Sequence, residues 1–190
     1  MSRFWVGMVC LLVSAGCAGS IKPHMAPPAT VSALAPGKGV VVGSFSQVST
    51  LKYEHSNFVA FSNKSRRVYR VISMQHREGD QSFDFIEGKE AGDLFAFVLP
   101  EGVYTVENAN TSSGYSRYET GALPEFEFTV SAGEILYLGE IYFGYDFAKV
   151  PTQKEGIPYQ LQLRNKWARD RALFEARYPE VDWSKARLNP

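Results

Sequence analysis

The chain has 190 residues, of which 45% are hydrophobic and 21% charged, as in an ordinary globular domain. Its 20 Lys and Arg balance its 20 Asp and Glu, so no basic excess indicates a nucleic-acid partner. The aromatic fraction is 14%, with 13 Phe and 10 Tyr, which favours β-structure. These values predict one folded domain with, at most, a small appendage.

Residues 1–16 contain the three parts of an export signal. Arg3 supplies the positive charge, residues 4–13 are all apolar or Gly, and small residues at 14–16 precede Cys17. The apolar run has about ten residues, whereas a helix that spans the hydrocarbon core needs roughly 20. A cleaved signal is therefore favoured over a permanent transmembrane helix.

The segment Val13–Cys17 resembles the lipobox of bacterial lipoproteins, with Ser14 where that family most often has Leu. The resemblance implies a diacylglyceryl group on Cys17, cleavage between Gly16 and Cys17, and acylation of the new N-terminus. Ala18 is similar to the outer-membrane default of the family. We therefore expect a lipid-anchored protein at the outer membrane that faces the periplasm. A plain secretory signal followed by an incidental Cys is the alternative.

Residues 17–38 are expected to comprise the lipidated Cys and a flexible tether. This segment contains several Pro and small residues and has no periodic apolar pattern, so it cannot bury enough surface to fold. The other cysteine, Cys10, would leave with the signal. The mature domain would then contain no free thiol and no disulfide, and its fold would depend on a hydrophobic core.

Residues 39–163 show short apolar runs separated by turns, which is typical of an all-β domain. We expect a mainly β fold, an antiparallel β-sandwich of about seven to eight strands with one C-terminal α-helix. Two polar segments, 75–92 and 108–124, are expected to be long loops or ragged hairpins. The expected strands span 39–46, 57–63, 68–74, 93–99, 103–107, 125–130, 135–143 and 159–163.

Two of these strands show how the sheets are covered. Residues 125–130 alternate, with Phe126, Phe128 and Val130 on one side, which indicates one dry and one wet face. Residues 94–99 are apolar on both sides, which predicts a central strand covered on both faces.

Residues 164–190 are expected to form a C-terminal helix and tail. Asn165 is the expected N-cap, residues 166–178 the helix, and Pro179 its end. An aromatic face on this helix predicts that it packs across an open end or edge of the sandwich. That face contains Trp167, Phe174 and Tyr178.

The segment Leu94–Tyr104 contains Leu-Pro-x-Gly-x-Tyr between two strands. This hairpin resembles that of transthyretin-like and carboxypeptidase-regulatory-like β-sandwich modules, and residues 128–139 are similar to their closing strands. Pro100 fixes φ at the corner, and Gly102 supplies a conformation that other residues resist. The resemblance covers residues 90–140 and implies a binding or structural module rather than a catalyst.

Side chains that could carry out chemistry are few. His24 lies in the expected tether and His55 stands apart, so the only local cluster is His76, Glu78, Asp80 and Asp84, for which a solvated loop is the simpler interpretation. A Gly-x-Ser-x-Gly elbow and a Gly-rich phosphate loop are both absent from the sequence. We therefore expect no catalytic residue, metal or cofactor.

Aromatic residues in the second half of the chain are candidate contacts for a ligand or partner, because exposed rings can stack on sugars or anchor a protein. Packing in or around the core is the simpler alternative. The tail also has a local excess of three positive charges that could face anionic headgroups, although a solvated helix face is simpler. The candidate contacts are Tyr115, Tyr118, Tyr142, Tyr145 and Phe147.

These patterns favour a membrane-anchored, periplasm-facing lipoprotein. Its β-sandwich would act as a non-enzymatic interaction or structural module of the bacterial cell envelope, with an envelope protein or cell-wall glycan as partner. A ligand-binding lipoprotein, for example one that binds glycan, is the second hypothesis. The third is a hydrolase that uses His55 or His76.

Overall fold

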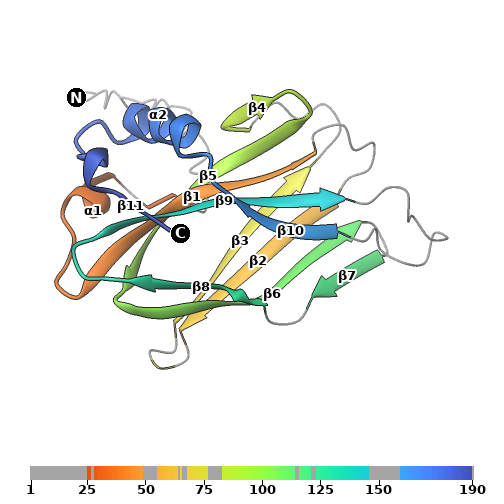
Figure 1. Cartoon of the computed structure of the whole chain (residues 1–190), viewed down its shortest axis with the longest axis horizontal. Helices are drawn as coiled ribbons and strands as arrows, with labels where there is room; N and C mark the ends of the chain where they lie inside the picture. The colour runs from red at the N-terminus through yellow and green to blue at the C-terminus, as the bar shows by residue number, and fades with distance from the viewer. Residues whose placement is uncertain are drawn as a thin grey trace, which may run out of the picture.

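The structure, a computed structural model, describes residues 25–26, 28–48, 55–63, 65, 68–76, 83–113, 116–120, 123–145 and 159–189. These residues form two packed β-sheets and a helix near the C-terminus (Figure 1), which confirms the expected fold class. In chain order the elements are α1 (Pro28–Ser32), β1 (Lys38–Val48), β2 (His55–Asn63), β3 (Val68–His76), β4 (Phe85–Glu87), β5 (Glu90–Pro100), β6 (Gly102–Ser113), β7 (Ser116–Thr120), β8 (Leu123–Val130), β9 (Ile135–Tyr145), β10 (Tyr159–Arg164), α2 (Trp167–Arg177), η2 (Trp183–Lys185) and β11 (Arg187–Leu188).

Sheet A has the strand order β10-β9-β1-β5-β4, and β11 also pairs with β9. Sheet B has the order β3-β2-β6-β7, and β8 also pairs with β6. The named strands pair antiparallel except that β1 and β11 each run parallel to β9. Sheet A is therefore mixed, because β1 runs parallel to β9. These two strands lie side by side although the strands of sheet B come between them in the chain.

The described residues form eleven strands, more than the seven or eight expected. Part of the difference comes from the two segments that were expected to be long loops or ragged hairpins. Strand β6 continues to Ser113 and pairs with β7, and the short strand β4 within 75–92 pairs with β5, so the alternative of hairpins is confirmed for these residues. The sequence does not distinguish the two alternatives, because the polar side chains give no apolar alternation even though the backbones pair in a sheet.

The main core lies between the two sheets. It is formed by alternate residues of β1, β5 and β9 from sheet A and of β2, β6 and β8 from sheet B. In β8, Phe128 and Val130 are buried whereas Glu127 and Thr129 are exposed, which confirms the alternation predicted for this strand. The largest fully buried side chains of the main core are Phe45, Phe95, Leu99, Tyr104, Leu136, Ile141 and Phe143.

The corner between β5 and β6 has the predicted residues and conformation, but the expected hairpin was wrong, because the corner carries the chain from sheet A to sheet B and the two strands do not pair. The local pattern shows where the chain turns and not which strand each one pairs with. Gly102 has a φ of 141°, a region that favours glycine, and it lets the chain reverse directly after Pro100. Tyr104 then returns into the main core, and its hydroxyl donates a hydrogen bond to the Pro100 carbonyl oxygen at 2.9 Å. The hydrogen bond fastens the corner to the strand that follows it.

A second core lies on the outer face of sheet A, which is the face that points away from sheet B. Apolar residues of β1, β5 and β9 meet α1, α2 and η2 there (Figure 1). Helix α2 therefore covers a sheet face, and the prediction that it packs across an open end or edge was wrong. The reason is that the residues of β1 and β5 that do not point into the main core are also apolar. The buried residues of the second core are Val31, Val40, Val42, Leu94, Ala96, Tyr137, Phe174, Tyr178 and Trp183.

The segment from Met25 to α1 belongs to the folded domain. Met25 bridges to Ala96 at the edge of β5, and the Ala26 N–H donates to the Ala96 carbonyl oxygen at 2.8 Å. The Tyr178 hydroxyl donates to the Ala26 carbonyl oxygen at 2.8 Å, and Val31 is 4% exposed. The prediction of a flexible tether over 17–38 was wrong for these residues. Their few apolar side chains form no pattern by themselves and find partners only in the second core.

We expect Val31→Ala to lower the free energy of unfolding by about 1.5 kcal/mol or more, because two buried carbon atoms are lost and a cavity remains. Urea unfolding followed by tryptophan fluorescence measures this change. The matched control is Thr30→Ser, which removes a methyl group from the exposed side of α1 and should change the free energy of unfolding by no more than about 0.5 kcal/mol. Equal effects of the two variants would contradict the docking of α1.

Candidate functional site

A polar region adjoins the second core on the outer face of sheet A. Along β1 this face carries Val40 and Val42 and then the buried residues Ser44 and Ser46. Four charged side chains from β9, β10 and α2 meet beside Ser44, and we call them the buried charge cluster. Two are fully buried, and the other two, both arginines, are 24% and 17% exposed. The cluster comprises Glu140, Arg164, Arg169 and Asp170.

Asp170 connects α2 to two strands of sheet A. Its Oδ2 accepts hydrogen bonds from the hydroxyls of Ser44 and Tyr137, each at 2.7 Å, and its Oδ1 accepts from Arg169 Nε at 2.7 Å. Burial raises the pKa of the Asp170 carboxyl, and the hydrogen bonds and charge from its three partners act in the opposite direction. Burial and the neighbouring carboxylate also raise the pKa of Tyr137, so this hydroxyl stays a donor.

Glu140 is shared by the two arginines. One oxygen, Oε2, accepts from Arg164 Nε at 2.6 Å, and Oε1 accepts from the Arg169 guanidinium at 3.0 Å. Arg164 also binds Glu90 through two hydrogen bonds, of 3.0 and 2.7 Å. Bidentate pairs of this kind fix the orientation of the guanidinium as well as neutralising its charge. The cluster therefore joins β9, β10, β5 and α2 in one network.

The side chains of the buried charge cluster pair with one another and connect α2 to strands of sheet A. The Ser44 hydroxyl is fully buried and bonded to Asp170, so a substrate has no route to it. Within the described residues, no group of three or more His, Cys, Asp or Glu side chains is placed to bind a metal ion. The arrangement supports a structural role for the cluster.

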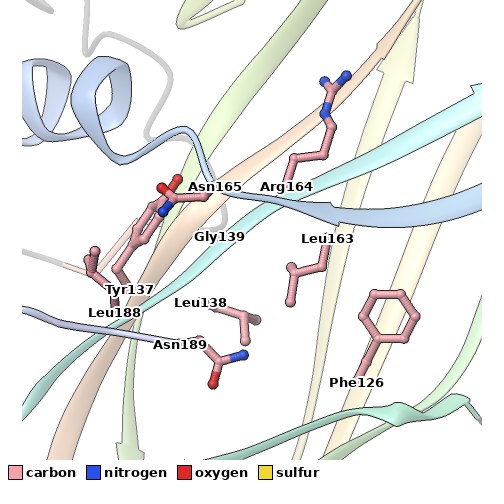
Figure 2. A pocket seen from close by; sticks show the side chains of 9 residues that line it. All are labelled: Phe126, Tyr137, Leu138, Gly139, Leu163, Arg164, Asn165, Leu188 and Asn189. Carbon is pink, nitrogen blue, oxygen red and sulfur yellow. The ribbon is translucent and has the colours of Figure 1, made fainter.

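A groove lies at the outer edge of β9 and is the second candidate site (Figure 2). The edge of β9 pairs with β11 at Leu136 and Tyr137 and with β10 from Glu140 onward, so Leu138 and Gly139 fall between the two partner strands. The groove at this gap has a volume of about 590 Å³. We call it the β9 groove, and it is lined by Phe126, Tyr137, Leu138, Gly139, Leu163, Arg164, Asn165, Leu188 and Asn189.

Apolar and amide groups line the β9 groove. In Figure 2 the side chains of Leu138, Leu163 and Phe126 form one apolar wall, whereas the Arg164 guanidinium points away from the groove toward the buried charge cluster. The side-chain amides of Asn165 and Asn189 lie along the other parts of the lining. The volume lies within the roughly 300–1,000 Å³ that is typical of sites for small ligands, whereas its lining is about half polar and therefore more polar than in most such sites.

Gly139 shapes this groove. Its φ is 117°, and a Cβ atom there would lie 3.1 Å from the Arg164 carbonyl oxygen and 3.1 Å from a Leu163 methyl group. The register between β1 and β9 shifts at this point, which makes a β-bulge. Because of the bulge, Leu138 and Ile141 both contribute to the main core although three positions separate them.

Of the predicted contact residues, Tyr142 is the one whose side chain is among those described. The Arg164 guanidinium packs on the Tyr142 ring, 3.7 Å from the centre of the ring. Tyr118 lies on β7 and Tyr145 ends β9, but their side chains fall outside the described part of the structure. The remaining predicted site residues lie outside the described residues altogether; they are Gly16, Cys17, Tyr115 and Phe147.

The histidine and carboxylate candidates are placed only in part. His55 and His76 are register partners on β2 and β3, which the sequence analysis did not foresee, and their side chains are outside the described part. Asp84 accepts hydrogen bonds from the Leu94 N–H and the Arg177 guanidinium, each at 2.8 Å, and so connects β5 to α2. The other candidates, His24, Glu78 and Asp80, lie outside the described residues.

The sequence analysis missed the buried charge cluster. One signal was present, because Glu140 interrupts the otherwise apolar and aromatic strand β9. A carboxylate in such a strand requires a buried cation nearby. The sequence does not show which arginines supply it, because Arg164 and Arg169 lie on separate elements and meet Glu140 only in the folded chain.

Comparisons with known proteins give little for this chain. No protein-family model matches it, and no curated protein matches it. One solved structure that it resembles is a leucine-rich repeat protein from Bacteroides thetaiotaomicron, with 14% sequence identity and a TM-score of 0.35. The match covers 66% of this chain and only 19% of that protein, and at this TM-score it carries no argument. In the described residues, no helix has the length and apolar character needed to cross a membrane.

We expect Glu140→Ala to lower the free energy of unfolding by about 3 kcal/mol, because it leaves two largely buried arginines short of a partner. This loss of unfolding free energy is at the lower end of the range for breaking a buried ion pair, because Arg164 still pairs with Glu90 and Arg169 still pairs with Asp170. The control is Glu87→Ala, which removes an exposed carboxylate that pairs with Lys166 and Arg169 and should cost no more than about 1 kcal/mol. Urea unfolding of both variants distinguishes the two expectations, and similar losses would contradict the structural role.

Proposed function

We propose that this protein is a bacterial lipoprotein, anchored through lipid on Cys17 and facing the periplasm at the outer membrane. The observation that carries the proposal is the segment Val13–Cys17, which ends an apolar stretch with small residues and a cysteine.

Acyl chains on Cys17 would provide a stable anchor. Each buried methylene contributes about 0.8 kcal/mol, and one chain by itself binds a membrane only marginally. The lipobox chemistry would add two or three chains to the same residue. Such an anchor needs no transmembrane helix, and the domain itself would remain in water.

We further propose that the domain acts as a non-enzymatic interaction or structural module of the cell envelope, on a transthyretin-like β-sandwich. The buried charge cluster supports this role, because its carboxylates and arginines are paired with one another and the buried hydroxyls of Ser44 and Tyr137 donate to Asp170. Crosslinking in whole envelopes followed by capture of the protein would identify the partner. Repeated capture with neither a protein nor a cell-wall partner would count against the role.

The anchor is tested by replacing each cysteine in turn. Cys17→Ser should abolish fractionation with the membrane, because no thiol remains to accept lipid. Cys10→Ser is the matched control and should leave membrane fractionation unchanged, since that residue would be removed with the signal. Mass spectrometry of the wild-type mature N-terminus should show an acylated Cys17, and an unmodified N-terminus elsewhere would overturn the proposal.

Binding of a small polar ligand, such as a glycan, is the second candidate function, and the β9 groove favours it. The groove combines an aromatic ring, an apolar wall and two side-chain amides. Amides hydrogen-bond to hydroxyl groups, and the carbon face of a sugar ring packs on apolar and aromatic surface. The rings of Tyr115 and Tyr145 remain additional candidates for this function.

We expect Asn189→Ala and Phe126→Ala to weaken glycan binding, as measured by calorimetry with oligosaccharides selected from a glycan array. Glu127→Ala is the control, because Glu127 neighbours Phe126 on β8 but is exposed and does not line the groove. If Tyr115→Ala or Tyr145→Ala abolishes binding and Asn189→Ala does not weaken it, the glycan site lies outside the β9 groove. Absence of binding to every oligosaccharide on the array would contradict glycan binding as a function.

A further inference from the structure

The distance between the lipid and the folded domain is set by how early in the chain the domain begins. Met25 and Ala26 pair with the edge of β5, and residues from there to Ser32 are fastened to the second core. This attachment has three independent parts, namely the backbone hydrogen bond to Ala96, the hydrogen bond from Tyr178 and the burial of Val31. The chain therefore leaves the domain at a fixed point.

The tether that remains is short. Eight positions separate residue 17 from residue 25, and at roughly 3.3–3.6 Å per residue they span at most about 26–29 Å when fully extended. A tether that continued to residue 38 would have 21 positions and reach at most about 69–76 Å. The docking of residues 25–34 thus removes more than half of the reach that the sequence pattern indicated.

The tether is shorter than the domain is wide. A compact domain of about 165 residues has a radius of gyration of about 15 Å, which corresponds to a diameter of about 40 Å. To place the opposite side of the domain on the bilayer, the chain would have to run from Met25 around the whole molecule. A span of about 26–29 Å is too short for that route.

We infer that the lipid anchor restricts the orientation of the domain: the side opposite Met25 is kept off the bilayer, and the outer face of sheet A near the edge of β5 lies closer to it on average. The surface concerned is formed by residues 25–34 and by the C-terminal end of α2, which lies beside them through Tyr178 (Figure 1). Its partner is the lipid surface. This inference rests on the proposed lipidation of Cys17.

Charge on this surface does not explain the orientation, so the tether must supply it. Arg177 at the end of α2 is paired with Asp84, and Glu180 follows close by with the opposite charge. Among the described residues there, no cluster of cations is available to attract anionic headgroups. The orientation should therefore depend on tether length and be insensitive to salt.

The orientation also determines what the rest of the domain can reach. Sheet B lies on the far side of sheet A from α1 and α2 (Figure 1), so its outer face and the β6–β7 hairpin would point away from the bilayer. Tyr118, one of the predicted contact residues, lies on that hairpin. A partner in the periplasm would meet this side of the molecule first.

The full lipidated chain allows a clean distance measurement, because lipid occupies Cys17 and Cys10 is absent from the mature protein. A single new cysteine can then carry a fluorescent donor, with acceptor-labelled lipid in the vesicle. The two positions are Thr30→Cys on α1 and Ser65→Cys at the turn between β2 and β3, both exposed and both conservative in size. Urea unfolding of each variant checks that the domain remains folded.

Energy transfer from position 30 should exceed that from position 65, and the difference should persist at high salt. Insertion of about 20 Gly and Ser residues after Ser20 lengthens the tether enough for free rotation, so the difference should then be lost. Equal transfer from the two positions, with acylated Cys17 confirmed by mass spectrometry, would overturn the inference and leave the anchor intact. A difference that survives the insertion would also overturn it, because a surface contact would then set the orientation. An unacylated Cys17 would instead overturn the proposed function.

Discussion

The fold depends on one constraint, which is that sheet A must be covered on both faces. Residues 40–42 of β1 and 94–99 of β5 are apolar at every position, so alternate residues such as Val41 and Val42 face opposite sides of the sheet and both are buried. Sheet B covers one side. The other side requires α1, α2 and η2, and the ends of the described chain are drawn into the domain for that purpose. The docking of Met25, Ala26 and Val31 follows from this requirement.

Burial of charge is the second consequence of the same arrangement. The outer face of sheet A becomes polar at Ser44 and Glu140, and helix α2 still covers that part of the sheet. Covering a carboxylate without a partner would be costly. Arg164 and Arg169 remove that cost, and Asp170 is in turn compensated by the hydroxyls of Ser44 and Tyr137. The cluster therefore specifies where α2 sits along the sheet, which apolar contacts alone would define less sharply.

Strands β5 and β9 flank β1 in sheet A, and the outer edge of each pairs with two short segments. On β5, strand β4 and the segment at Met25 pair with successive parts of the edge, and on β9 strands β10 and β11 do the same. Short pairing segments protect an edge from pairing with other chains. On β9 the two segments do not meet, and the β9 groove is the gap between them. The β9 groove thus results from the way in which the edge of β9 is paired.

The sequence by itself determined the mainly β fold, the positions of the main strands, the corner at Pro100 and Gly102, and the extent of α2 to within a residue at each end. These features follow from local patterns, since alternation, turn chemistry and helix capping are read over a few neighbouring residues. The expected N-cap, Asn165, was wrong by one position: Lys166 is the N-cap of α2, and the Asn165 side-chain oxygen accepts from the Trp167 N–H at 3.0 Å directly before it. Only the tertiary structure decided the docking of residues 25–34, the place of α2 on a sheet face, and the pairing of Glu140 with two arginines. Each of these joins segments far apart in the chain, so none of them leaves a periodic signal in the sequence.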